Sequence, residues 1–317
     1  MNAGRSLSTV IAMLSLLLLQ PADAHADSEL AVYKGAGCEG AKRVPDFEAW
    51  LGRRVDRVVD FLDGRNWAAM TGSAKWIAQC WQKAGYKLVL SVPMLPKDNS
   101  ATLSDGKSGS LDHYFSEVGQ ILVDNGHADS ILRIGWEFNG PWYPWAAHKD
   151  PDSFAAFWRR IVTAMRAVPG NRFRFDWNPT IGTTKIDPER VYPGDDVVDI
   201  IGLDIYNQSW HPQRHDPAVR WDEKVNGAHG LRWHRDFAKA HNKPRSFPEW
   251  GTGTRKDGHG FGDDPGFIKN MHEWVTASDV VYHGYWDFRA PDFHAELSTG
   301  QFPAAAAQFK QLFAKGQ

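Results

Sequence analysis

The chain has 317 residues, of which 42% are hydrophobic and 23% charged, and its formal net charge is −2. A chain of this composition can bury a sizeable core, and its balanced charge gives no reason to expect a nucleic acid or an anionic membrane surface as a partner. Its 15 tryptophans are many for a soluble protein. Because a buried indole N–H group needs a hydrogen-bond partner, this abundance suggests that some flat aromatic faces bind a ligand, with sugars as the leading candidates.

The first 26 residues are predicted to be a signal peptide rather than part of the fold. Arg5 provides a positive charge, and Val10–Leu19 form an apolar stretch too short to span a bilayer. Small residues around Ala24 and Ala26 fit a cleavage site for signal peptidase. The alternative is an uncleaved membrane anchor.

Residues 27–317 are expected to form one catalytic domain, secreted or periplasmic, monomeric and without membrane contact after cleavage. An exported protein meets an oxidising environment, so Cys38 and Cys80 could form a disulfide. Two isolated cysteines leave the free thiols as an equal alternative.

Short apolar runs alternate with longer amphipathic runs along this region. Strands are expected at Ala31–Lys34, Arg57–Leu62, Lys87–Val92, Ile131–Gly135, Arg172–Trp177, Val198–Leu203, Arg245–Glu249 and Val280–Trp286. Helical patterns span Asp46–Arg53, Ala74–Ala84, Leu111–Asn125, Pro151–Val168, Leu231–His241, Pro265–Thr276 and Pro303–Lys315. Eight strands with helices between them favour an α/β fold closed into a parallel (β/α)8 TIM barrel, and no strand is followed by a glycine-rich nucleotide motif.

Two glutamates lie at strand ends, where such barrels build their active sites. Glu137 follows the fourth strand and Glu249 ends the seventh. Strand alternation places Glu137 on the face of Arg133, and Glu249 on the face of Phe247 and Arg245. Hydrolysis of a glycosidic bond needs one carboxylic acid to protonate the leaving oxygen and a second carboxylate to attack the anomeric carbon or activate water. The alternative is that either glutamate is only a buried ion-pair partner of Arg133 or Arg245.

Aromatic residues near the same strand ends are expected to line a substrate cleft. Trp142, Tyr143 and Trp145 lie in a proline-punctuated loop directly after Glu137, which favours stacking on sugars over core packing. Further tryptophans expected in the cleft are Trp177, Trp210, Trp250 and Trp286. Six others fall inside helical patterns and are expected to pack between helices and barrel: Trp50, Trp76, Trp81, Trp158, Trp233 and Trp274.

The histidines do not predict a metal site, and no cofactor is expected. His211 and His215 have a suggestive spacing, but Pro212 and Pro217 argue against a helix that would bring both onto one face. The two histidines are better candidates for hydrogen bonds to sugar hydroxyls. Three strand-end residues could do the same or could tie barrel layers together: Asp176, Asn178 and Asp204.

Three segments resemble glycoside hydrolase family 26, the β-mannanase-type family of retaining (β/α)8 glycosidases. Arg133–Trp145, which reads RIGWEFNGPWYPW, looks like the family's acid/base segment. Ser246–Gly251 looks like the nucleophile segment and Gly202–Tyr206 like the sixth strand. The resemblance covers the mature chain in element order, and it implies that Glu137 is the acid/base and Glu249 the nucleophile.

The resemblance extends to neighbours of this pair. Tyr206 matches the tyrosine that hydrogen-bonds the nucleophile, and Trp286 matches the aromatic floor beside the scissile sugar. Mannanases of this family usually carry histidine immediately before the acid/base, whereas this chain has Trp136 at that substrate-contacting position. Three polar residues are expected to support the site: Arg133, Asn139 and Asp204.

Together these features predict a secreted, endo-acting, retaining β-glycosidase. The substrate polysaccharide is left open among β-mannan-like chains, β-glucan and a bacterial exopolysaccharide. The alternative is a carbohydrate-binding barrel or a transglycosylase that processes an exopolysaccharide without net hydrolysis.

Overall fold

The computed structural model describes residues 28–314, so the predicted signal peptide lies outside the described residues. Its strands are β1 (Glu29–Tyr33), β2 (Arg57–Phe61), β3 (Lys87–Val92), β4 (Ile131–Ile134), β5 (Arg174–Trp177), β6 (Ile200–Gly202), β7 (Ile205–Tyr206), β8 (Arg245–Gly251) and β9 (Val280–Trp286). They form one sheet in the order β6-β5-β4-β3-β2-β1-β9-β8-β7, and a further parallel pairing of β6 with β8 closes it. The expected (β/α)8 barrel is confirmed. The predicted sixth strand, Val198–Leu203, contains β6, and the short β7 follows it; the two pair with successive parts of β8.

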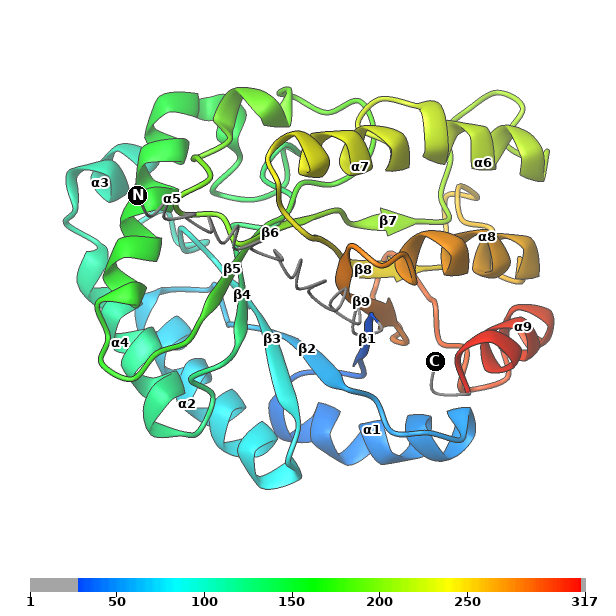
Figure 1. Cartoon of the computed structure of the whole chain (residues 1–317), viewed down its shortest axis with the longest axis horizontal. Helices are drawn as coiled ribbons and strands as arrows, with labels where there is room; N and C mark the ends of the chain where they lie inside the picture. Colours follow the sequence, from blue (N-terminus) through cyan, green and yellow to red (C-terminus); the bar gives the residue numbers. More distant parts are fainter. Residues whose placement is uncertain (1–27, 315–317) are drawn as a thin grey trace, which may run out of the picture.

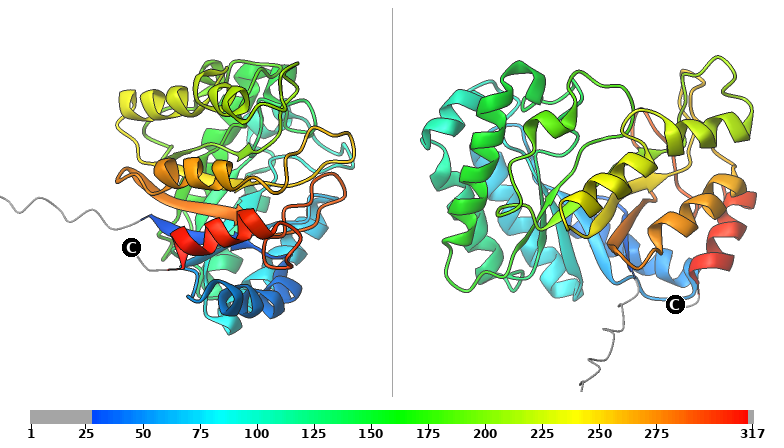
Figure 2. Two further views of the ribbon diagram at one scale, coloured as in Figure 1. Left: turned by 90° about the vertical axis from the view of Figure 1, so that its right-hand side faces the viewer. Right: turned by 45° about the horizontal axis from the view of Figure 1, so that its top comes forward.

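Helices surround the barrel in the views of Figures 1 and 2. They are α1 (Gly37–Leu51), α2 (Trp67–Ala84), α3 (Leu103–Ser108), α4 (Asp112–Asp124), α5 (Pro151–Arg166), α6 (Pro217–Asn226), α7 (Leu231–Ala240), α8 (Pro265–Val275) and α9 (Pro303–Phe313), with 3-10 turns η1 (Ala147–Lys149) and η2 (Pro188–Val191). Helices α3 and α6 were not predicted from the sequence. Pro217 was interpreted as a helix breaker, but it is the first residue of α6, where a missing N–H costs nothing and the Asp216 carboxylate accepts the Ala218 amide hydrogen.

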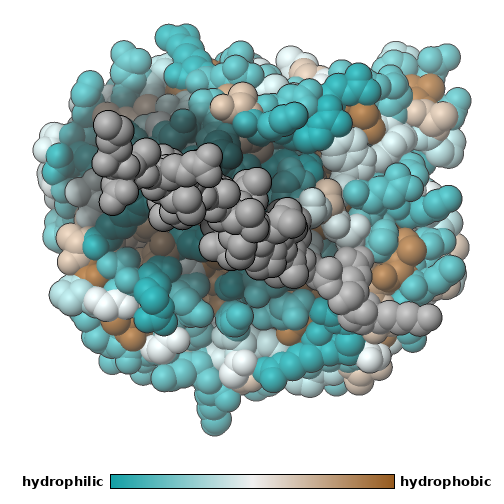
Figure 3. All heavy atoms as spheres, in the orientation of Figure 1, coloured by the Kyte–Doolittle hydropathy of each residue, from teal (hydrophilic) through white to brown (hydrophobic). Residues whose placement is uncertain are grey.

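The core has two layers, one inside the barrel and one between barrel and helices. The inner layer is a ring of buried residues from the strands: Ala31, Val59, Val89, Ile131, Ile200 and Tyr282. The larger outer layer includes Trp81 and Trp158, as predicted, but Trp76 is 44% exposed, so the packing predicted for it is wrong. On the face shown in Figure 3, apolar residues occur only in small separate groups on a mostly hydrophilic surface.

A disulfide joins Cys38 in the first turn of α1 to Cys80 in α2, which resolves the alternative that the sequence left open. Beside it, the buried Asp60 carboxylate accepts hydrogen bonds from the Gly37 amide and the Trp81 indole, both at 2.7 Å. The start of α1 is thereby fixed to β2. Between residues 28 and 314, no helix combines the length and apolar character that a membrane crossing requires.

Candidate active site

A tight turn brings Glu137 to the rim of the barrel. β4 ends before Gly135, which has φ +56°, and Glu137 itself has φ +51°, a left-handed conformation uncommon for a residue with a side chain. The Glu137 amide donates to the Asn178 carbonyl at 2.8 Å. This turn, and not the strand alternation predicted from Arg133, positions the glutamate. Backbone strain of this kind concentrates at functional sites.

A bulge in β8 turns Glu249 toward the inside of the barrel. The register between β8 and β9 shifts after Phe247. Ser246 donates to Asp176 inside the barrel at 2.6 Å, whereas Phe247 packs outward against α7. The predicted common face of Arg245, Phe247 and Glu249 is therefore wrong, because a bulge changes the alternation by one residue.

Three groups hold Glu249, whose exposed fraction is only 7%. Its Oε1 accepts from Arg133 Nη2 at 2.8 Å, and its Oε2 accepts from the Tyr206 hydroxyl at 2.7 Å. Its amide donates to Asp204 Oδ1 at 3.1 Å. The ion pair with Arg133 that the sequence left as an alternative is thus present. Charge-assisted hydrogen bonds of this kind stabilise a carboxylate in its ionised form.

Arg133 links four parts of the barrel beneath the site, and its side chain is fully buried. Besides Glu249 it donates to Asn178 Oδ1 at 2.7 Å, Ser91 Oγ at 2.9 Å and Asp204 Oδ2 at 2.7 Å. Asn178 and Asp204 are themselves fully buried, so they tie the barrel together and do not reach sugar hydroxyls. Burial raises the pKa of Asp204 well above its usual value, and the charge of Arg133 opposes this rise.

Glu137 has a different environment. Its Oε2 accepts a hydrogen bond from the indole of Trp142, at 2.9 Å, and Trp142 is 54% exposed. Burial, and then the negative charge of Glu249, raise the pKa of Glu137 to about 7, against the lowering effects of Trp142 and Arg133. A substantial fraction of Glu137 therefore carries a proton near neutral pH.

Aromatic rings from several strand ends surround the pair. Trp286 stacks on Tyr33 at 4.3 Å between ring centroids, and Phe61 meets the rings of Trp286 and Trp136 edge-on at 5.8 Å and 5.4 Å. Trp286 also lies 6.4 Å from the ring of Tyr206. Tyr33 and Phe61 were not predicted to line the site. They end β1 and β2 in the same way that Trp286, which was predicted, ends β9.

Three tryptophans predicted to line the cleft are buried elsewhere. Trp145 stacks beneath Tyr143 at 4.5 Å, Trp177 packs against α7, and Trp250 packs against α9. Their exposed fractions are at most 1%, so they cannot stack on a sugar and the prediction is wrong for them. Trp177 and Trp250 follow inward-facing residues, and strand geometry points them outward into the helical layer.

Trp136 is almost completely buried. Its indole N–H donates to the Tyr143 hydroxyl at 2.9 Å, so it forms part of the aromatic wall and offers little free ring surface. Asn139 is also buried, and it exchanges two hydrogen bonds with the backbone of Thr180 at 2.8 and 2.9 Å. Asn139 thereby anchors the loop that carries Glu137 to the loop after β5.

The loop after β7 carries the remaining predicted residues. Trp210 is 59% exposed and stacks on His259 at 5.1 Å, so its ring is available on the surface. His211 accepts from the Gln213 amide through Nδ1, and His215 is exposed. Across residues 28–314, no group of three His, Cys, Asp or Glu side chains is arranged to hold a metal ion.

Comparisons with known proteins place this geometry in context. Residues 93–220 match the family model of glycosyl hydrolase family 26. Endoglucanase H of Acetivibrio thermocellus is 28% identical over 184 residues, which are 54% of this chain and 19% of that protein. The chain therefore spans only a minor part of the length of this relative.

Solved structures share the fold across most of the chain. GH26C from a Muricauda species has a TM-score of 0.66 at 17% identity, with 92% of this chain and 86% of that chain covered. The catalytic domain of the GH26 endo-β-1,4-mannanase from Bacillus sp. JAMB-750 has a TM-score of 0.64 at 16% identity, with coverage of 91% and 86%. A mannanase of Bacillus subtilis gives 0.61 at 16% identity, with coverage of 88% and 86%.

Proposed function

We propose that this chain, whose residues 93–220 match the family model of glycosyl hydrolase family 26, hydrolyses internal β-linkages of a polysaccharide with retention of anomeric configuration. One observation carries the proposal. Glu249 accepts hydrogen bonds from the Arg133 guanidinium and the Tyr206 hydroxyl, whereas the pKa of Glu137 is raised to about 7. A double-displacement glycosidase requires two carboxyl groups in different environments, one of which arrives protonated.

In the first step, Glu249 attacks the anomeric carbon while Glu137 gives its proton to the departing glycosidic oxygen. The bond from the anomeric carbon to that oxygen breaks, and a covalent bond to Glu249 forms. Arg133 and Tyr206 orient the attacking carboxylate. As Glu249 loses its charge in the covalent intermediate, the charge repulsion that raised the pKa of Glu137 falls.

In the second step, Glu137, now ionised, takes a proton from water. The resulting hydroxide-like oxygen attacks the anomeric carbon, and Glu249 leaves as a carboxylate. Two inversions give net retention. The indole of Trp142 stabilises Glu137 in its ionised form during this step through the 2.9 Å hydrogen bond.

The site supports a glycan with apolar sugar faces as substrate. The exposed ring of Trp142, whose indole bonds to Glu137, and the ring of Trp286, near Tyr206, provide flat surfaces beside the carboxyl pair, and C–H faces of pyranoses stack on such rings. Because Trp136 is part of a wall and its N–H is already bonded to Tyr143, it offers no polar group to a sugar hydroxyl. This difference favours a β-glucan or an exopolysaccharide over mannan. We also propose export, which the Cys38–Cys80 disulfide supports.

A panel of β-mannan, β-1,3- and β-1,4-glucans and native bacterial exopolysaccharides tests the proposal. Endo-action predicts that viscosity falls before reducing ends accumulate, and retention predicts that proton NMR detects the β-anomer first. Early release of the α-anomer would exclude retention. Longer chains formed without net release of reducing ends would instead identify a transglycosylase.

A further inference from the structure

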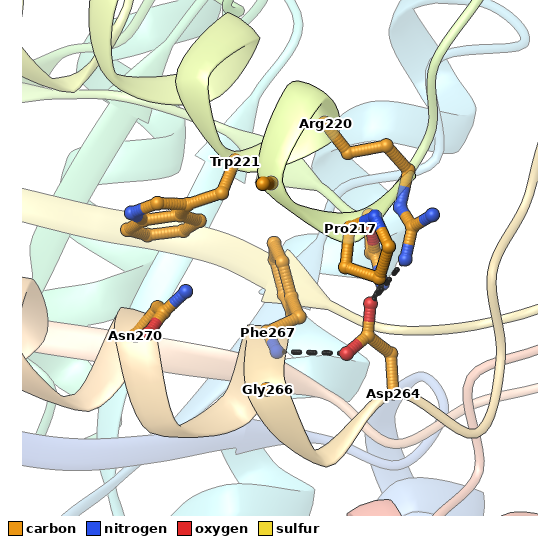
Figure 4. A pocket seen from close by; sticks show the side chains of 9 residues that line it. Pro217, Arg220, Trp221, Asp264, Gly266, Phe267 and Asn270 are labelled. Carbon is orange, nitrogen blue, oxygen red and sulfur yellow. Dashed lines mark hydrogen bonds and ion pairs between the residues drawn. The ribbon is translucent and has the colours of Figure 1, made fainter. Parts of the chain in front are cut away.

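A hollow of about 290 Å³ lies between α6 and α8, apart from the two glutamates. Figure 4 shows Trp221 of α6 above Asn270 of α8 at one end of it, with the ring of Phe267 beside them. The other end is closed by the ion pair between Arg220 and Asp264, at 2.7 Å. The hollow therefore has an aromatic end and a polar end.

Several polar groups around the hollow have no partner within the described part of the chain. The Trp221 indole N–H and the Asn270 amide form no hydrogen bond with residues 28–314, and both side chains are only partly buried. Arg220 is 6% exposed, and its Nε is buried without a partner. A buried N–H group without a partner is costly, so it marks a place where a ligand or water completes the site.

The charges around the hollow disfavour an ionic ligand. Both helices begin there, but each first turn is already capped by its own carboxylate, because Asp216 accepts from Ala218 and Asp264 accepts from Phe267. An anion would meet these carboxylates, and a cation would meet Arg220. A neutral molecule with hydroxyl groups and an apolar face matches the donors, the amide and the ring together.

We propose that this hollow is a second carbohydrate site, which binds one sugar unit of a neutral glycan with its C–H face on Trp221 and its hydroxyls toward Asn270 and Arg220. The proposal rests on the proposed function, since the ligand is a chain of the class that the enzyme cleaves. Such a site would keep the enzyme on its polysaccharide while another part of the glycan occupies the carboxyl pair.

The floor of the hollow separates it from the catalytic pair. Asn207, which lines the hollow, follows Tyr206 directly, but its amide donates to Thr252 Oγ1 and to the Phe261 carbonyl, each at 3.0 Å, and is 1% exposed. Tyr206 instead turns its hydroxyl to Glu249. A ligand in the hollow therefore contacts the back of β7 and does not reach the reacting atoms.

Residue-specific NMR can distinguish the two sites in one experiment. The Glu137→Gln variant, which lacks the acid, is isotope-labelled at the tryptophan indole nitrogens and titrated with cellohexaose and then with mannohexaose. The Trp221 signal, assigned with Trp221→Phe, is expected to shift with a Kd of roughly 0.1 to 1 mM, as is usual for one stacked sugar with few hydrogen bonds. The signal of Trp76, an exposed tryptophan on α2, is the matched control and should not move.

A second variant makes the test independent of aromatic packing. Asn270→Ala breaks no hydrogen bond in the described chain and should weaken the titration of Trp221 by roughly 3- to 10-fold, while the titration of Trp142 stays unchanged. Shifts of Trp142 without any shift of Trp221 would overturn the second site and leave the proposed function standing. Shifts of Trp221 alone would support the second site and count against the catalytic assignment. If neither signal moves with either hexaose, the inference is overturned.

Discussion

The ends of β4 and β8 each present a glutamate, and the two are held in opposite ways. Glu249 receives hydrogen bonds from Arg133 and Tyr206 on its two oxygens and lies in a rigid network of buried groups. Glu137 accepts a hydrogen bond from the uncharged indole of the exposed Trp142 and stands on a strained turn. Identical side chains thus lie in different environments, set by the charge of the groups around them, and the roles proposed for them rest on that difference.

The largest expected effect is the loss of turnover when Glu249 is replaced. Glu249→Ala should lower kcat on every substrate by on the order of 10⁴-fold or more, since no other group is placed to form the covalent intermediate. Steady-state kinetics with an aryl β-glycoside measures it, with a thermal melt to show that the fold is kept. A loss below roughly tenfold would remove Glu249 from the nucleophile role.

Removal of Arg133 tests how strongly its positive charge stabilises the buried carboxylates around Glu249. Arg133→Met leaves Asp204 and Glu249 buried without their cation and should lower the free energy of unfolding by roughly 3–5 kcal/mol. The matched control is Arg245→Met, whose partner Asp279 is 49% exposed and can be rehydrated, so its loss should be nearer 1 kcal/mol. Equal losses in urea titrations would contradict this account.

Tyr206→Phe removes one of the two side-chain donors from Glu249 and should reduce kcat/KM by roughly 10- to 100-fold, the usual worth of a hydrogen bond to a charged group. Tyr86→Phe is a fair comparison, because Tyr86 donates to Glu48 at 2.9 Å on the outside of the barrel. That control should retain full activity. If both variants behave alike, Tyr206 has no special part in holding the nucleophile.

The smallest effect concerns the protonation of Glu137. Because its pKa in the folded protein is raised to about 7, above its ordinary value, protonated Glu137 stabilises the fold at low pH, and this contribution is lost as pH rises through 7. Glu137→Gln stays neutral, so the variant should gain roughly 1–3 kcal/mol over the natural protein between about pH 5 and pH 8. The free energy of unfolding of both proteins is measured by chemical denaturation at several pH values. If the two curves against pH run parallel, the pKa of Glu137 is not raised.

The barrel and the two glutamates could be predicted from the sequence, because eight apolar runs interleaved with helical patterns leave few closed arrangements. The path of the chain at each glutamate could not. Gly135 and Glu137 adopt positive φ values, so a turn and not strand alternation positions Glu137, and the bulge in β8 makes the face predicted for Glu249 wrong. Such local departures depend on contacts with neighbouring strands that a single strand's pattern does not contain.

For the tryptophans too, only part of the placement could be predicted from the sequence. A ring at a strand end lies in the cleft or behind it according to a one-residue difference in register, so Trp286 reaches the site while Trp250 is buried against α9. The role of Arg133 as a shared partner of four residues on or just after other strands also depends on tertiary structure. Its position inside the barrel was foreseeable, but its partners were not.

The central claim is that Glu249 forms the covalent bond and Glu137 supplies and withdraws the proton. The most direct measurement is azide rescue of Glu137→Ala with a nitrophenyl β-glycoside, whose leaving group departs without protonation. The glycosyl-enzyme should accumulate on the peptide that contains Glu249, and added azide should release a β-glycosyl azide, because azide needs no general base. An α-glycosyl azide obtained from Glu249→Ala, with no rescue of Glu137→Ala, would contradict the account and exchange the two roles.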